Sequence, residues 1–116
     1  MGDAVSLKQL FQKWEAETDP SASTLSSWRG IVRNLDSFLG PKANDIRAVH
    51  SADIVSWKDK LVREGKAAAT ISRGYLGCAR ALFRFAVANH FVESDPTGGI
   101  KVTRKAKAGT RMLGYG

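Results

Sequence analysis

The sequence is poor in the features that mark secreted, membrane-spanning or disordered chains. Its single cysteine, Cys78, cannot form a disulfide within the chain, and we expect it to be a small buried hydrophobe. Only three prolines occur in 116 residues, of which 43% are hydrophobic, so the chain should fold. No apolar run approaches the roughly 20 residues that cross a bilayer, and no basic stretch followed by an apolar block opens the chain. These absences favour one cytoplasmic domain with no membrane contact.

Acidic residues are scarce in the second half of the chain, and this asymmetry accounts for the net charge of +7. Residues 1–65 carry nine Lys and Arg against nine Asp and Glu. Residues 66–116 carry nine more Lys and Arg, opposed only by Glu93 and Asp95. One-sided positive charge indicates a polyanionic partner, although a basic tail that only aids solubility would give the same composition.

Apolar residues recur at intervals of three and four, and this spacing predicts helices throughout. No useful period-two alternation occurs, so we expect an all-α fold, an orthogonal bundle of four to five helices. One tryptophan falls on the apolar stripe of each of the first three helices, which assigns Trp14, Trp28 and Trp57 to the core. The expected helices cover about 7–18, 23–39, 51–64 and 68–89.

Capping residues support these boundaries. Ser6 and Gln9 have the spacing of a capping box at the start of the first helix. Ser51 is expected to cap the third helix, with Asp53 in the first turn, where the helix dipole favours an anion. Gly65 should end that helix.

The polar face of the last helix predicts a nucleic-acid-binding surface. Gly74 and Gly77 lie in or beside this face, where each costs about 1 kcal/mol relative to alanine. A glycine there lets a DNA backbone approach closely between arginines, or lets another helix pack close. The ridge consists of Thr70, Arg73, Gly77, Arg80 and Arg84.

The second helix offers a weaker candidate surface, because two arginines on a solvated face are ordinary. Its polar residues are Ser26, Ser27, Arg29, Gly30 and Arg33. Catalytic chemistry is not indicated, since His50 and His90 are the only histidines and have no partner at metal-ligand spacing. No nucleophile elbow or phosphate loop is present, and we expect no cofactor and no metal.

With the helices placed, the order of residues from about Leu7 to Ile100 resembles the core-binding domain of the tyrosine recombinase, or phage integrase, family. No single motif is decisive, but four occur in the family's order. They are Leu10-Phe11-x-x-Trp14, then Thr24-x-x-x-Trp28-x-x-x-Val32, then Ile46-x-x-Val49 before Asp53-Ile54-x-x-Trp57, and finally Thr70-Ile71-x-Arg73-x-Tyr75 with the closing Asp95-Pro96.

The resemblance implies a SAM-like domain that lies across a major groove on one side of duplex DNA, with its second and fourth helices facing the DNA. Where the family often has a capping residue before the fourth helix, this chain has Ala67, so a phosphate contact there would use backbone N–H groups and Thr70. Carried over by position, the DNA-binding residues are Lys66, Thr70, Arg73, Gly77 and Arg80, and, from the second helix, Ser27, Arg29 and Arg33.

The resemblance also implies a division of the chain. Residues 1–100 would be the core-binding domain, and residues 101–116, with Tyr115, a basic interdomain linker. The family's catalytic tyrosine, arginines, lysine and histidines cannot be mapped here, so the fragment should bind DNA without cutting it. The implied partners are double-stranded DNA at a recombination site, the catalytic domain of the parent recombinase and further recombinase protomers on the DNA.

Two alternatives remain open on the residues alone. The third and fourth helices could form the helix-turn-helix pair of a stand-alone DNA-binding regulator, although residues 65–69 are long and glycine-alanine-rich for that turn. The chain could also be a helical protein-interaction module whose basic tail meets an acidic partner. Binding to duplex DNA that weakens steeply with salt would exclude the second alternative.

Overall fold

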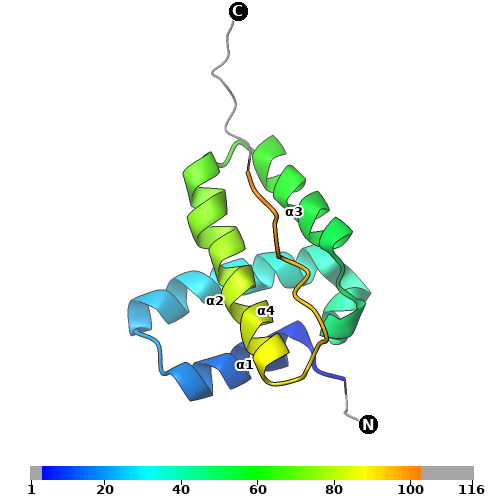
Figure 1. Cartoon of the computed structure of the whole chain (residues 1–116). Coiled ribbons are helices and arrows are strands. Elements are labelled where there is room, and N and C mark those ends of the chain that lie inside the picture. Colours follow the sequence, from blue (N-terminus) through cyan, green and yellow to red (C-terminus); the bar gives the residue numbers. More distant parts are fainter. Residues whose placement is uncertain (1–3, 103–116) are drawn as a thin grey trace, which may run out of the picture.

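A computed structural model of the chain describes residues 4–102, which form helices and contain no strand (Figure 1). The all-α prediction is confirmed. The helix expected over 68–89 is continuous from residue 68 to residue 88, with a π-helical segment, η3, near its start. The elements are α1 (Leu7–Thr18), α2 (Ala22–Leu39), η1 (Gly40–Asn44), η2 (Ile46–Ala48), α3 (Ser51–Arg63), η3 (Thr70–Tyr75) and α4 (Leu76–Ala88).

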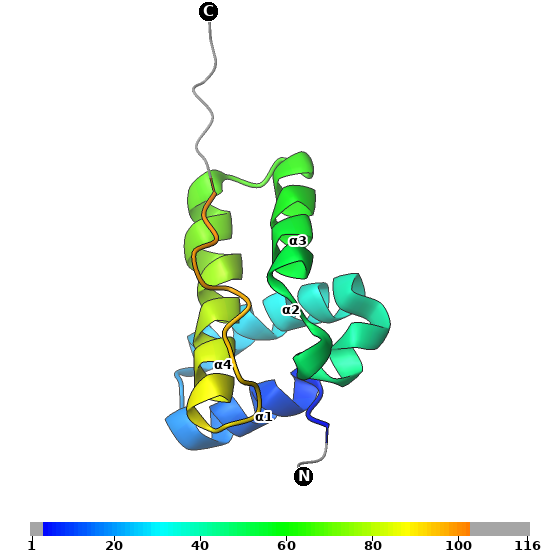
Figure 2. The same ribbon diagram turned by 45° about the vertical axis from the view of Figure 1, so that its right-hand side comes forward.

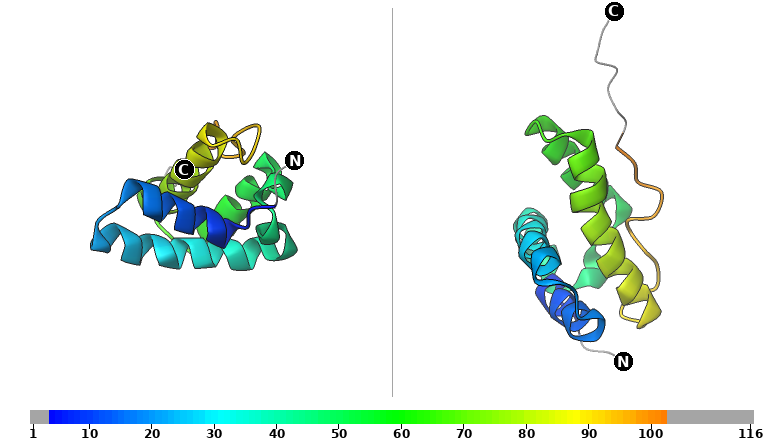
Figure 3. Two further views of the ribbon diagram at one scale, coloured as in Figure 1. Left: turned by 90° about the horizontal axis from the view of Figure 1, so that it is seen from below. Right: turned by 90° about the vertical axis from the view of Figure 1, so that its left-hand side faces the viewer.

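Two helical hairpins cross each other to form the bundle. Helices α1 and α2 run antiparallel in one layer, and α3 and α4 run antiparallel across them (Figures 1 and 2). After α4, residues 91–102, which we call the strap, return along α4 on the side away from α1 and α2 (Figure 3). Helix α4 is therefore covered on two sides.

The helix boundaries follow the local capping chemistry. At α1 the capping box is complete, because Gln9 N–H donates to Ser6 Oγ over 3.1 Å and Ser6 N–H donates to Gln9 Oε1 over 2.9 Å. Helix α2 begins earlier than expected, since Ser21 accepts a hydrogen bond from the Thr24 N–H and serves as its N-cap. Gly40 ends this helix, with φ of +61°.

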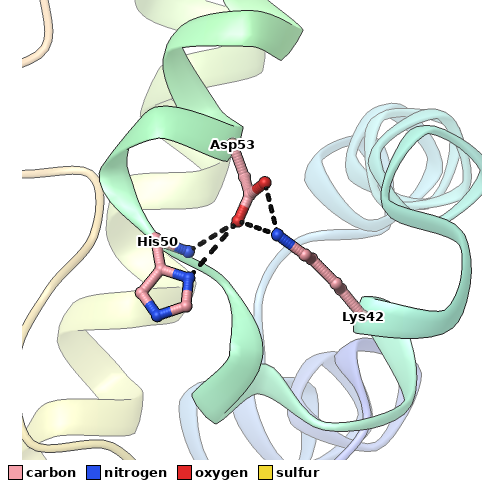
Figure 4. A network of polar contacts seen from close by, with 3 residues as sticks. All are labelled: Lys42, His50 and Asp53. Atoms are coloured by element: carbon pink, nitrogen blue, oxygen red, sulfur yellow. Dashed lines mark hydrogen bonds and ion pairs between the residues drawn. The ribbon is translucent and has the colours of Figure 1, made fainter.

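The predicted N-cap residue of α3 is wrong. Ser51 is the first helical residue, and His50 occupies the N-cap. The His50 N–H donates to Asp53 Oδ2 over 2.9 Å (Figure 4). Gly65, with φ of +87°, follows the end of the helix as expected.

Asp53 also joins α3 to η1. The Lys42 ammonium donates to both carboxylate oxygens of Asp53, over 2.8 and 3.0 Å (Figure 4). This hydrogen bond from Lys42, assisted by the bond from the His50 N–H, lowers the pKa of Asp53 below its ordinary value of 3.8, while partial burial opposes the shift. Asp53 therefore stabilises the fold in its ionised form.

The core assignment of the tryptophans is confirmed for Trp14 and Trp57, while Trp28 is half-buried. Trp57 is fully buried, and its Nε1–H donates to Asn34 Oδ1 of α2 over 2.9 Å. Trp14 and Trp28 stack with ring centroids 4.7 Å apart, which ties α1 to α2. The polar role of Asn34 had no signal in the sequence.

The π-helical segment changes which residues of the last helix are buried. The Leu76 N–H donates to the carbonyl of Ile71, five residues earlier, and both side chains are 0% exposed. A spacing of three and four from Ile71 along an unbroken α-helix predicts that Tyr75 and Cys78 are buried and passes over Leu76. Tyr75 is only half-buried, and the Lys66 ammonium lies 5.7 Å from its ring centroid.

No helix within residues 4–102 is long and apolar enough to cross a membrane. Most of the segment expected to be a basic linker or tail, residues 103–116 with Tyr115, lies outside the described residues.

Leu76→Ala should lower the free energy of unfolding by about 2–5 kcal/mol, because it removes a fully buried side chain at the π-helical turn. Urea denaturation measures the change. The control Val55→Ala alters a side chain that is 37% exposed on α3 and should change stability by less than about 0.5 kcal/mol. Equal losses in the two variants would contradict the burial of Leu76.

Asp53→Asn should destabilise the fold at neutral pH by about 0.5–1 kcal/mol, because it removes the ion pair with Lys42 and the anion at the start of α3. The folded-state pKa is lowered, so this stability is present above pH 3.8 and is lost as pH falls through the folded value. Denaturation curves of variant and wild type should thus converge in acid. The control Glu17→Gln, which removes no ion pair of residues 4–102, should shift stability little, and an Asp53→Asn deficit that persists in acid would refute the assignment.

Candidate nucleic-acid interface

Helices α2 and α4 meet where the predicted basic ridge begins. A Cβ on Gly74 would lie 4.0 Å from Ile31 Cδ1, so Gly74 faces α2. One turn before Ile31, exposed Ser27 lies on the same side of α2. Exposed Thr70 and Arg73 and the half-buried Gly77 surround Gly74 on the other helix. We call Ser27, Thr70, Arg73 and Gly77 the crossing surface.

The charges near this surface are not neutralised by acids. Arg73 and Arg84 are exposed and make no ion pair with any other residue between 4 and 102. Lys66 sits at the start of the last helix, over Tyr75. Asp95 is engaged internally, because its Oδ1 accepts hydrogen bonds from the Thr97 N–H over 2.8 Å and from the Thr97 hydroxyl over 2.5 Å. Arg73 is therefore a cation on the crossing surface that no ion pair among residues 4–102 neutralises.

Arg80 does not share this surface, although the sequence placed it on the same ridge. Its side chain is partly buried, and its guanidinium donates to the Ile100 carbonyl of the strap over 2.5 Å. This bond to Ile100 places the end of the Arg80 side chain on the side of α4 that the strap covers. The expectation that Thr70, Arg73 and Arg80 point outward together is wrong for Arg80, and its role on DNA stays a prediction.

The arginines of α2 lie away from the crossing surface. Two residues along an α-helix correspond to a rotation of about 200°, so Arg29 faces nearly opposite to Ser27. Arg29 and Arg33 are exposed and line a hollow with Lys8 and Glu15 of α1. The structure thus separates the residues predicted on α2 into two groups.

Packing does not explain the two glycines of the last helix. The Cβ contact of Gly74 with Ile31 would be an ordinary one, and a Cβ on Gly77 would meet only the Ser72 carbonyl, at 3.6 Å. Alanine fits at both positions. The alternative that these glycines allow close helix packing therefore loses its support.

One cysteine and two histidines are further side chains with possible chemistry among the described residues. Cys78 is 1% exposed, and burial raises the pKa of its thiol to about 12, so the expectation of a buried hydrophobe is confirmed. His50 and His90 line a common hollow between η2, the start of α3 and the strap, which their sequence spacing did not indicate. No group of three or more His, Cys, Asp or Glu within the described part of the chain could hold a metal ion.

The fold is that of an all-helical, SAM-like bundle, and comparison with known proteins specifies the family. Residues 7–90 match the family described as phage integrase, N-terminal SAM-like domain, and the chain belongs to this family. It is 29% identical over 106 residues to tyrosine recombinase XerD of Agrobacterium fabrum (strain C58 / ATCC 33970). The match covers 91% of this chain and 32% of that protein, so the chain spans about a third of this relative's length. No solved structure gives a significant match.

Proposed function

We propose that this chain binds duplex DNA as the core-binding domain of a site-specific tyrosine recombinase or integrase. Membership of the integrase SAM-like family supports this role. The observation that carries it is the crossing surface, where exposed Arg73 has no acidic partner among residues 4–102 and lies beside Thr70 and Gly77. The domain would bind in a major groove of double-stranded DNA at a recombination site.

Each group on the crossing surface has a distinct contact to make. The Arg73 guanidinium donates two parallel hydrogen bonds, which suits guanine O6 and N7 or a phosphate. The hydroxyls of Thr70 and Ser27 donate to phosphate oxygens, which fixes the register of the domain on the duplex. Gly77 leaves room for the sugar-phosphate backbone. Lys66 and Arg84 add positive charge along the helix, while Arg29 and Arg33 reach DNA only at its flank.

Strand cleavage belongs to a catalytic domain of the parent recombinase in this proposal. Residues 1–100 then act as a clamp on one side of the duplex, and residues 101–116 lead toward the catalytic domain. Further recombinase protomers on the same DNA would be partners, and the site of action is the cytoplasm. A helix-turn-helix regulator receives less support, because α3 and α4 run antiparallel rather than crossing at the steep angle of that motif (Figure 2).

Electrophoretic mobility shift with duplex DNA tests the proposal. The affinity should fall by roughly 0.9 log units per log unit of salt for each phosphate contacted. Because the crossing surface and its neighbours offer several cations, we expect a slope equivalent to about three to five phosphates. Absence of salt-dependent binding would refute the proposal. The protein-interaction module would then be the remaining candidate function.

Arg73→Ala should weaken duplex binding by about 1–3 kcal/mol, because it removes the central cation of the crossing surface. Lys58→Ala is the matched control, since Lys58 lies on α3, outside this surface, and pairs with Asp59. Fluorescence anisotropy with a labelled duplex measures both. The same loss in the two variants would mean that overall charge, rather than the crossing surface, binds DNA.

Gly77→Ala should change the stability of the fold and the affinity for DNA in opposite directions. It should raise the free energy of unfolding by up to about 1 kcal/mol, because alanine favours the helix and meets no obstruction. The added methyl group should weaken DNA binding by about 1 kcal/mol or more if a strand approaches Gly77 closely. The matched control is Gly30→Ala on α2, where a Cβ has nothing within 4 Å. Unchanged DNA affinity in Gly77→Ala would show that no backbone lies against this residue.

A further inference from the structure

A hollow of about 460 Å³ lies between α1 and α2, away from the crossing surface. We call it the α1–α2 groove. Its lining includes Lys8, Phe11 and Glu15 of α1 and Arg29, Val32 and Arg33 of α2. Ser27 belongs to the crossing surface, and Arg29 lies about 200° from it around α2. A duplex on the crossing surface therefore approaches the molecule from another side.

The rim of the α1–α2 groove carries more positive than negative charge. Lys8, Arg29 and Arg33 are exposed, and none of them makes an ion pair with another residue between 4 and 102. Glu15, which is half-buried, lines the same groove. An anionic group would therefore be attracted to this rim.

The charges are not spread evenly along the groove. Helices α1 and α2 run antiparallel, and Trp14 stacks on Trp28 near one end of the groove (Figure 1). Lys8 comes six residues before Trp14, and Arg33 comes five residues after Trp28. In antiparallel helices these steps lead in the same direction by similar distances, so Lys8 and Arg33 lie at the other end. Glu15 follows Trp14 directly and lies away from them. A carboxylate between the two cations would face no acid of the groove.

The floor of the α1–α2 groove is apolar and preformed. Phe11 and Val32 line it and are 6% and 5% exposed. Phe11 stacks on Trp14 with ring centroids 5.9 Å apart, and Trp14 stacks in turn on Trp28. Because these rings already support one another, an apolar side chain could bind here without rearranging the groove, which lowers the cost of binding.

We propose that the α1–α2 groove binds a short acidic segment of a partner protein, with a carboxylate between Lys8 and Arg33 and an apolar side chain on the floor. This inference goes beyond the proposed function, and it assigns Arg33 to a protein partner rather than to the flank of the duplex. The phosphate backbone of DNA suits the groove less well, because it offers no apolar group to the floor and is repelled by Glu15. An extended peptide can instead donate a backbone N–H to Glu15.

An NMR titration of the isotope-labelled full chain with the acetylated peptide Glu-Glu-Leu-Glu-Glu tests the groove. The amide signals of Lys8, Phe11 and Arg33 should shift in one saturable event, whereas those of Thr70 and Arg73 should stay in place. Replacing the leucine of the peptide by glycine should weaken binding about threefold or more, because the floor loses its apolar partner. Equal shifts on both surfaces, or equal affinity for the two peptides, would overturn the proposal.

The double variant Lys8→Gln with Arg33→Gln should weaken peptide binding about threefold or more, because both cations that face the carboxylate are removed. The matched control, Lys13→Gln with Arg63→Gln, removes two cations that do not line the groove and should change peptide binding less than about 1.5-fold. All four side chains are exposed, so both variants should fold. Equal losses in the two variants would show that net charge attracts the peptide, and the proposal would be overturned.

Duplex DNA distinguishes the α1–α2 groove from the crossing surface. Saturation with duplex at about 0.15 M salt should change peptide affinity less than about threefold, because charges on separate faces are screened from each other. Displacement of the peptide by duplex would overturn the proposal. If Lys8→Gln with Arg33→Gln weakened DNA binding and left peptide binding unchanged, the groove would be a DNA contact and the proposal would be wrong. If the wild type fails to bind DNA, the proposed function fails, while the peptide titration still decides this inference.

Discussion

The structure depends on the burial of the last helix between two covers. The α1–α2 hairpin packs on one side of α4 and the strap on the other (Figure 3). Leu76, Ala79 and Phe83 are accordingly at most 1% exposed. A helix covered in this way keeps only a narrow stripe for contact with a partner. The residues on that stripe, Thr70 and Arg73 among them, are therefore the ones exposed for contact with a partner.

The same constraint explains why one basic ridge in the sequence serves two purposes in the fold. Arg73 and Arg84 lie on the open stripe, whereas Arg80 lies on its border with the strap. The guanidinium of Arg80 satisfies the backbone carbonyl of Ile100 at this border. One arginine of the ridge, Arg80, thus holds the strap, whereas Arg73 and Arg84 remain exposed to solvent.

Much of the bundle was predictable because local patterns determine it. The capping box at Ser6, the break at Gly40 and the apolar spacing place the helices within a few residues. The features that sequence reasoning missed are not local. The Arg80–Ile100 bond spans 20 residues and joins a helix to an irregular segment, which has no periodicity to detect. Ser27 and Arg29 were assigned to one polar face, although two residues along an α-helix lie about 200° apart. The positions of α1 and α4 show which neighbour each of them faces.

The π-helical turn sets the rotational position of the side chains on both of its sides, because Ile71 and Leu76 are both 0% exposed. From Cys78 to Ala86 the side chains are registered by the core, whereas Thr70 and Arg73 lie in the wider turn that precedes it. Inserting or removing one residue in that turn would rotate the leading side chains about the helix axis by roughly 100° while the following core register stayed in place. Ile71 lies in the same turn and is 0% exposed, so such a change would also rotate a core side chain out of the interior. The length of this turn is therefore constrained by the packing beneath it.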